Sequence, residues 1–383
     1  MTTWRLICDD DVTASSGLAA DELLTRWVGS GRSQPTLRLY TYRPHCALVG
    51  RFQRVESELR VDYCREHGIP INRRPTGGGA IIMGAGPLGV ALTLPGSGEQ
   101  AYRRAREVMA KVSAGLIGGL ARLGVQAEFR RKNDIEVNGR KIAGVGIYRA
   151  PTDGLLFHAS VLLDLDVPLM LRVLNIPVEK ISDKEIAAVA ARTSTVRGEL
   201  GRAVGLAEAR QAITAGYADA FGVTLAAGDF SAAERDAIAA LEREKYLTDE
   251  WIYQATAVPD SAAGARLKTP GGLLDIRVAL AGRTIKSAFI GGDFFAADNA
   301  IADLEARLRW HVADPAAIAA TLHQAYERWP LELDSIPLDG LVEAVLAAVG
   351  RAIEHQNDVA RSSGAANRDT NVGSSHTGHE RRH

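Results

Sequence analysis

The sequence is poor in cysteine. Its 383 residues include only Cys8, Cys46 and Cys64, and no two of them have the close spacing of a metal-binding or redox pair. This argues against a disulfide framework and against a cysteine zinc site, and we expect a protein of the reducing cytoplasm. Apolar runs near the roughly 18 residues of a transmembrane helix are also missing. The acidic run Asp9–Asp11 lies where a signal peptide would have its apolar core.

An excess of charge of either sign is missing as well. The chain has 45 basic and 46 acidic residues, and its formal net charge is −1. Proteins that bind nucleic acid or an anionic membrane by long-range attraction are usually strongly basic, so we expect neither partner. Hydrophobic residues make up 46% of the chain and charged residues 24%, a mixture that supports a sizeable globular core. The length favours two or three domains.

Residues 1–225 alternate between strand-like and helical segments. Leu37–Tyr42 and Ala47–Arg51 are short β-prone runs bounded by turn residues. Glu99–Leu123 has the apolar periodicity of a helix, and Gly124 follows it as a stop signal. This alternation favours an α/β or α+β domain.

A smaller unit follows the first. Ser231 and Glu234 form a capping-box pattern, which opens a connecting helix within residues 226–245. For residues 246–353 the patterns predict a hairpin and three helices, at Leu274–Leu280, Thr284–Ile290, Ala296–Leu308, Asp314–Trp329 and Asp339–Ile353. They would form a small α+β domain of their own. The polar tail, 354–383, has too few apolar residues to offset the entropy of ordering, and we expect it to be disordered.

A glycine-rich stretch beside two arginines is the most informative motif. It consists of Arg73, Arg74, Pro75, Thr76, Gly77, Gly78, Gly79 and Ala80, followed by Ile81 and Ile82. Glycine exposes backbone N–H groups to a ligand, and guanidinium forks bind phosphate or carboxylate. The combination suits an anion such as an acyl-adenylate, while the simpler alternative is a surface turn with two solvated arginines. The nearby Gly84–Gly89 matches GxGxxG, but the strand-like Val90–Leu94 that follows excludes a dinucleotide fold.

The second motif is a predicted hairpin. Asn138-Gly139 is a strong two-residue turn signal between alternating residues. That turn pairs Glu136 with Lys141 and places Asp134 on the same face, where an acid and a lysine can hold Mg²⁺ and an acyl phosphate together. The alternative is an exposed cross-strand ion pair of little energetic value.

A histidine in an apolar strand forms the third motif. His158 follows Phe157 and precedes Ser160 and a run of aliphatic residues. Such a histidine is either a hydrogen-bonded core residue or a ligand-binding group, and the sequence leaves both open. No clear Ser/His/Asp or Cys/His set accompanies it.

Together and in this order, these motifs resemble the lipoate–protein ligase A family of the biotin/lipoate ligase superfamily. The family's Arg-Arg-x-[Ser/Thr]-Gly-Gly-Gly-Ala is similar to residues 73–80. Its Asn-Asp and Arg-Lys-[Ile/Val]-x-Gly are similar to Asn133-Asp134 and Arg140–Gly144, and its His-[Gly/Ala]-[Ser/Thr] to His158–Ser160. The resemblance covers roughly residues 4–350, including a C-terminal accessory domain.

The resemblance implies a class II ligase-like catalytic domain with mixed sheets flanked by helices, and an ATP- and Mg²⁺-dependent reaction. Lipoate would become lipoyl-AMP, and the lipoyl group would then pass to a lysine of a carrier, either a lipoyl domain of an acyltransferase subunit or a glycine-cleavage H-like protein. Lys141 would contact the acyl carboxylate and α-phosphate, and Asp134 would lie on the Mg²⁺ side. The predicted nucleotide and acyl site is Arg73, Arg74, Thr76, Gly77, Gly78, Gly79, Ala80, Ile81, Ile82, Asn133, Lys141, His158 and Ser160.

This chain departs from the family after the glycine-rich motif and again at Glu185, where the family prefers Gly. Met83-Gly84 and Pro87 stand where the family usually has His-Asp and an adenine-contacting Asn, so nucleotide recognition is expected to differ. Two alternatives to a ligase remain open: a non-catalytic lipoyl or acyl-adenylate binding module, and a divergent octanoyl or lipoyl transferase that works without a cysteine. The cysteine of octanoyltransferases has no counterpart here, because Ala127–Arg130 and Val178 occupy its two family positions. A biotin ligase is disfavoured because its Gly-Arg-Gly-Arg loop is absent.

Overall fold

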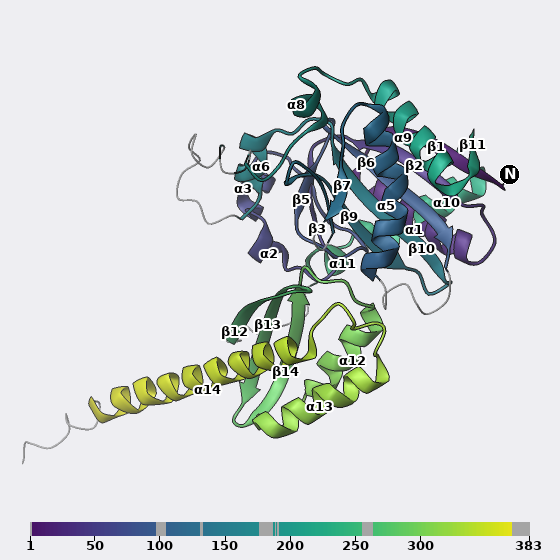
Figure 1. Ribbon diagram of the computed structural model, residues 1–383. Coiled ribbons are helices and arrows are strands. Elements are labelled where there is room, and N and C mark those ends of the chain that lie inside the picture. Colours follow the sequence, from purple (N-terminus) through teal and green to yellow (C-terminus); the bar gives the residue numbers. More distant parts are fainter. Residues whose placement is uncertain are drawn as a thin grey trace, which may run out of the picture.

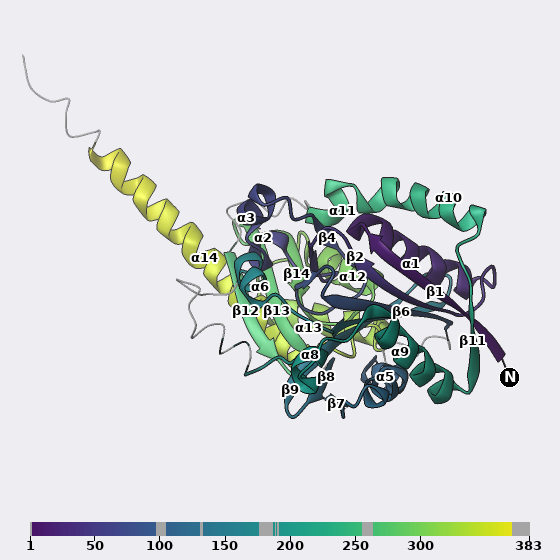
Figure 2. The same ribbon diagram turned by 90° about the horizontal axis from the view of Figure 1, so that it is seen from above.

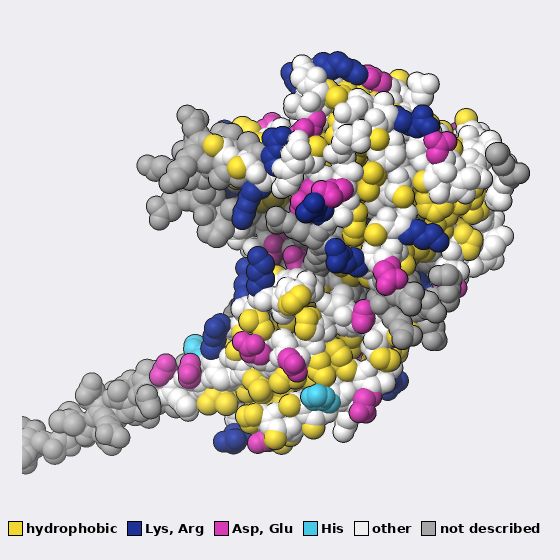
Figure 3. All heavy atoms as spheres, in the orientation of Figure 1, with side chains coloured by type: hydrophobic (Ala, Val, Ile, Leu, Met, Phe, Trp, Pro, Cys, Tyr) yellow, Lys and Arg dark blue, Asp and Glu magenta, His cyan; other side chains and the backbone are white. Residues whose placement is uncertain are grey.

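The protein has a larger and a smaller lobe, joined near residue 254 (Figure 1). The structure is a computed structural model that describes residues 2–96, 105–130, 133–175, 187, 189, 191–254 and 263–369, with side chains up to 358. The space-filling view shows a hollow between the lobes, with Lys and Arg side chains along its rim (Figure 3).

A mixed sheet forms the centre of the larger lobe, in the order β11-β1-β2-β6-β10-β9-β8-β7. Its strands are β1 (Thr2–Val12), β2 (Thr36–Tyr42), β6 (Pro87–Pro95), β7 (Glu128–Arg130), β8 (Asp134–Val137), β9 (Arg140–Arg149), β10 (Gly154–Leu162) and β11 (Val223–Ala227). β1 is parallel to β2 and β11, and the other neighbours are antiparallel. A small second sheet holds β4 (Ile71–Arg73), β3 (Cys46–Val49) and β5 (Ile81–Met83).

Helices cover both faces of the large sheet (Figure 2). α5 (Ala105–Arg122) and α9 (Leu206–Phe221) pack on one face, and α1 (Ala14–Gly29) and α10 (Ala232–Leu241) on the other. Gly119 and Gly216 let the α5 and α9 backbones touch, since a Cβ at Gly216 would lie 2.3 Å from Gly119 N. The shorter elements are α2 (Val55–Glu58), α3 (Val61–Glu66), α6 (Val167–Val173), α8 (Val196–Leu200), the π-helix η1 (Glu242–Tyr246) and α11 (Asp249–Tyr253).

The smaller lobe has its own core. A sheet of β12 (Ala263–Thr269), β13 (Gly272–Ala281) and β14 (Thr284–Gly292) packs against α12 (Asp298–Leu308), α13 (Pro315–Arg328) and α14 (Leu338–Asp369). The lobes meet where Phe52 stacks on Phe294 at a centroid distance of 5.0 Å. Gly292 N–H donates to Phe52 O there, at 2.9 Å.

The α+β fold with a small C-terminal α+β unit is confirmed, and two details differ from the predictions. Residues 246–254, grouped with the C-terminal unit, pack against the larger lobe, where Asn72 donates to Tyr246 O at 2.8 Å. α14 continues past Ile353 to Asp369, into the stretch predicted as a disordered tail, and Gln356 donates to Leu280 O at 3.0 Å. Residues 370–383 lie outside the described residues. No described helix is long and apolar enough to span a membrane.

Candidate active site

A pocket opens where the glycine-rich stretch faces β9 and β10. It collects residues from both sheets and from α1, which lie far apart in the sequence. Its lining consists of Leu18, Tyr40, Tyr42, Leu48, Arg74, Thr76, Gly79, Ala80, Ile81, Met83, Asn133, Lys141, Gly144, Val145, Gly146, His158, Ala159 and Ser160. Nine predicted site residues meet here: Arg74, Thr76, Gly79, Ala80, Ile81, Asn133, Lys141, His158 and Ser160. Arg73, Gly77, Gly78 and Ile82 lie outside this lining.

Arg74 holds the glycine-rich loop around the pocket. Its guanidinium donates to Gly77 O at 3.0 Å, to Gly79 O at 2.6 Å and to Leu48 O at 3.3 Å. Burial lowers the pKa of Arg74 to about 10, so the side chain stays cationic at neutral pH. A buried cation with only carbonyl partners leaves uncompensated positive charge beside the pocket, which favours an anionic ligand.

Arg73 has a different place. Its fully buried guanidinium donates to backbone carbonyls of two segments, Gly50–Gln53 and Trp251-Ile252, at 2.6–3.1 Å. It therefore ties the loop after β3 to α11 and does not line the pocket. Burial, with the nearby charge of Arg51, lowers the pKa of Arg73 to about 9.

Lys141 and Asp134 form an ion pair at the pocket, as the hairpin prediction placed them. Lys141 Nζ lies 2.7 Å from Asp134 Oδ1. The turn residues Asn138 and Gly139 have φ of 50° and 75°, the left-handed values that a type I′ turn requires. Glu136 pairs with Lys141 as predicted. A bulge between Ile135 and Glu136 then shifts the register by one residue, so that Asp134 lies opposite Gly144 and not opposite Ala143, its partner in a regular hairpin.

The Lys141 side chain lies over Gly144 of β9, where the strand has no side chain. A Cβ at Gly144 would lie 3.0 Å from Lys141 Nζ and 3.7 Å from Ser160 Oγ. The amine is thus held over β9, next to β10, and 34% of the side chain stays exposed. Among the described residues, no group of three or more His, Cys, Asp and Glu could hold a metal ion. The role of Asp134 toward Mg²⁺ stays a prediction.

His158 has the hydrogen-bond partner of a core histidine and the position of a ligand-binding one. It is 7% exposed, lines the pocket, and its Nε2 lies 2.8 Å from Asp21 Oδ2 of α1. Sequence reasoning missed Asp21, and also Tyr40 and Tyr42 of β2. An acid inside the apolar run of α1 was the available signal for Asp21, because a charged residue on a buried helix face needs a partner.

None of the three thiols lines the pocket. Cys8 is exposed on β1, and Cys46 and Cys64 are buried. Burial raises the pKa of the Cys46 thiol, which keeps it protonated and a poor nucleophile.

Comparison with known proteins agrees with this geometry. Residues 13–218 match the sequence model of the lipoyl protein ligase A/B catalytic domain. Octanoyltransferase LipM of Symbiobacterium thermophilum is 33% identical over 278 residues, which cover 65% of this chain and 98% of that protein. LipM of Kyrpidia tusciae is 30% identical and covers 66% of this chain and 100% of that protein.

Solved structures share the fold. A bipartite lipoate protein ligase of Thermoplasma acidophilum is 25% identical with a TM-score of 0.60, over 68% of this chain and 100% of that chain. LipL1 of P. falciparum in complex with lipoate is 17% identical with a TM-score of 0.69, over 90% of this chain and 99% of that chain, a likeness of fold alone. By the matched domain and its relatives, the chain belongs to the lipoyl protein ligase A/B catalytic domain family.

Proposed function

We propose that this protein is an acyltransferase that moves an octanoyl or lipoyl group to a lysine of a lipoyl-domain carrier, without an acyl intermediate on a protein cysteine. The observation that carries the proposal is a family pocket with two cations, Arg74 and Lys141, and no thiol in its lining. Relatives named octanoyltransferase favour transfer of an already activated acyl group over the predicted ATP-dependent ligation.

The apolar and the charged residues of the pocket have different proposed roles. Leu18, Leu48 and Met83 give the acyl chain an apolar wall. Lys141 is placed to stabilise the negative charge that develops on the acyl oxygen or on the leaving group. The carrier lysine supplies the attacking amine, so no nucleophile of the enzyme is needed.

ATP-dependent lipoate ligation is the second candidate, because the uncompensated cation Arg74 beside the exposed Gly79 suits a phosphate. In that reaction ATP, Mg²⁺ and lipoate give lipoyl-AMP on the same residues, with Asp134 toward the metal. A lipoate-protein ligase A bound with ATP has this fold, at 24% identity and a TM-score of 0.58. At Gly84, one of the positions where the chain departs from the family motif, the His45 ring occupies the space of a side chain. A Cβ there would lie 2.4 Å from His45 Cδ2.

The test is intact-mass analysis of a lipoyl domain and of an H protein after incubation with the protein. One arm supplies an octanoyl thioester of an acyl carrier protein, and a second supplies octanoate or lipoate with Mg-ATP. A mass gain in the first arm alone supports the transferase, and a gain that requires ATP supports the ligase. Ligand binding without any gain overturns both and leaves a binding module.

A variant without thiols tests the mechanism directly. Cys8→Ser, Cys46→Ala and Cys64→Ala together should keep most of the acyl transfer, because no step passes through sulfur. A loss greater than about tenfold in a variant that still melts cooperatively would contradict the proposal.

A further inference from the structure

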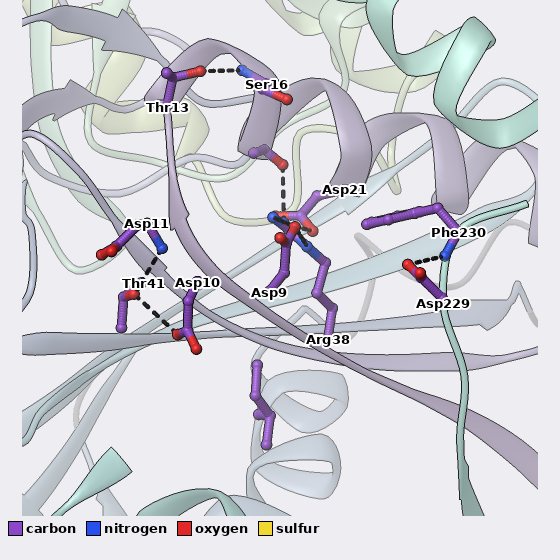
Figure 4. A network of polar contacts seen from close by, with 12 residues as sticks. Asp9, Asp10, Asp11, Thr13, Ser16, Asp21, Arg38, Thr41, Asp229 and Phe230 are labelled. Carbon is purple, nitrogen blue, oxygen red and sulfur yellow. Dashed lines mark hydrogen bonds and ion pairs between the residues drawn. The ribbon is translucent and has the colours of Figure 1, made fainter. Parts of the chain in front are cut away.

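A chain of buried charges ends at the pocket wall. His158 Nε2 bonds to Asp21 Oδ2, and Asp21 Oδ1 accepts from Arg38 Nη1, both at 2.8 Å. Arg38 in turn donates to Asp9 Oδ2 at 2.8 Å. Figure 4 shows Asp9, Asp21 and Arg38 meeting between α1 and the sheet. Asp21 is fully buried and Arg38 is 1% exposed, so the sequence maintains a costly polar network beside the site.

The network fixes the charge of Asp21 and the orientation of the imidazole. Burial alone would raise the pKa of Asp21, but Arg38 and the hydrogen bond with His158 hold it below its ordinary value. An ionised Asp21 accepts the hydrogen of Nε2, which leaves Nδ1 as the basic nitrogen of His158. Within the described residues Nδ1 has no hydrogen-bond partner.

The strand register places His158 near the reacting atoms. His158 lies opposite Gly146 and Ser160 opposite Gly144. Both face the same side of β10, roughly 7 Å apart along the strand. Lys141 Nζ lies over Gly144, and Thr76 covers Gly146, where a Cβ would be 3.2 Å from Thr76 Cβ. A carbonyl bound at Lys141 therefore shares this face with His158, which lies two residue pairs along the strands.

We infer that His158 is the general base of acyl transfer and that Asp21 is its positioning residue, an inference that rests on the proposed function. The neutral amine of the carrier lysine attacks the acyl carbon, and a C–N bond forms. The bond from that carbon to its leaving group breaks, and the leaving group keeps the electron pair. The extra proton on the new amide nitrogen passes to His158 Nδ1 and from there to the leaving group or to water.

The other titratable groups around His158 are poor proton acceptors. Lys141 of β9 and Arg74 of the glycine-rich loop are cations, and Arg38 of β2 is a cation engaged by Asp9 and Asp21. Tyr40 and Tyr42 of β2 are hydroxyls whose pKa burial raises. Asp134 is held by Lys141. Among the described residues that line the pocket, His158 is the one imidazole.

The experiment compares two nucleophiles with one acyl donor. Transfer from whichever donor the wild-type protein uses is measured to the carrier lysine, by intact mass, and to hydroxylamine, as the hydroxamate. After attack, hydroxylamine carries a more acidic proton than an alkylamine, so water removes it without help from the protein. His158→Gln should lower transfer to the carrier by about 10²-fold or more, the usual contribution of a general base, and lower hydroxamate formation far less.

Controls separate this role from a structural one. His323 is an exposed residue of α13, and His323→Gln should have the same transfer rate as wild type with both nucleophiles. Asp21→Asn keeps the shape of Asp21 and leaves Arg38 its ion pair with Asp9, and it should lower carrier acylation at least tenfold, again sparing hydroxylamine. Equal losses with both nucleophiles, or no loss in a folded His158→Gln protein, overturn the inference. A wild-type protein that acylates no carrier from any donor overturns the proposed function, and the inference with it.

Discussion

Replacing Lys141 by methionine should remove activity and leave the fold intact. Methionine keeps most of the aliphatic stem over Gly144 and removes only the ammonium group. The backbone of Lys141 is held independently of its side chain: its N–H donates to Arg192 O at 2.9 Å, and its O accepts from Ser194 N–H at 2.8 Å. The change therefore isolates one charge.

The two expected magnitudes differ widely. The side chains of Lys141 and Asp134 are 34% and 23% exposed, and such a partly exposed ion pair contributes at most about 1 kcal/mol to the free energy of unfolding. For the larger lobe, with about 250 residues, that is a fall in Tm of about 2 °C. Loss of one preorganised partner of a developing oxyanion usually slows turnover by about 10²–10³-fold, or roughly 3–4 kcal/mol of activation free energy.

The assay is the initial rate of carrier acylation by intact mass, with Tm measured by differential scanning fluorimetry on the same samples. Lys286→Met is the matched control, because that lysine is exposed on β14 of the smaller lobe. It should change neither quantity. A Lys141→Met protein that acylates the carrier within about threefold of wild type would refute the assignment of Lys141. A fall in Tm of more than about 10 °C would refute the claim that its role is local.

Three further outcomes are expected. Gly77→Ala should destabilise the protein by several degrees, because the new Cβ would lie 2.2 Å from Phe294 O, whereas Gly79→Ala, with nothing within 4 Å, should leave Tm unchanged. Arg73→Met should lower the Tm in heat denaturation, and the midpoint in urea denaturation, more than any pocket variant. It removes the donor from several buried carbonyls at once. Burial alone would raise the pKa of Glu234. Hydrogen bonds from Arg5, from the Ser231 backbone and from Ser33 outweigh it and lower that pKa from 4.5 to about 2. This carboxylate therefore stabilises the fold above pH 4.5, and the stability advantage of wild type over Glu234→Gln should disappear as the pH falls toward 2.

Local signals predicted the hairpin well. Asn138-Gly139 fixes a two-residue turn, and the alternation around it then fixes which side chains share a face, so Lys141 and Asp134 were placed on one face from sequence alone. The bulge between Ile135 and Glu136 was not predictable in this way. It leaves Ile142 of β9 without a partner on β8, and nothing in the local alternation marks that position.

Long-range contacts explain most of what the sequence did not predict. His158 meets Asp21 across 137 residues, and nothing in the local pattern of either segment names the other. Arg73 and Arg74 are neighbours with the same chemistry, so a sequence pattern assigns them one role. The structure separates them because β4 ends between them: Arg73 turns toward α11, and Arg74 turns back under the glycine-rich loop.

The three consecutive glycines serve three different demands. Gly77 takes the close approach of Phe294 from the smaller lobe, Gly78 has φ of +95°, and Gly79 faces the pocket and accepts from Arg74. The loop that shapes the pocket therefore also packs against the smaller lobe. Arg51 reinforces this link, because its side chain pairs with Asp298 of α12 at 2.8 Å while its N–H donates to Thr76 O at 3.0 Å. The smaller lobe therefore contacts the site through Gly77 and through Arg51, whose N–H donates to the pocket residue Thr76.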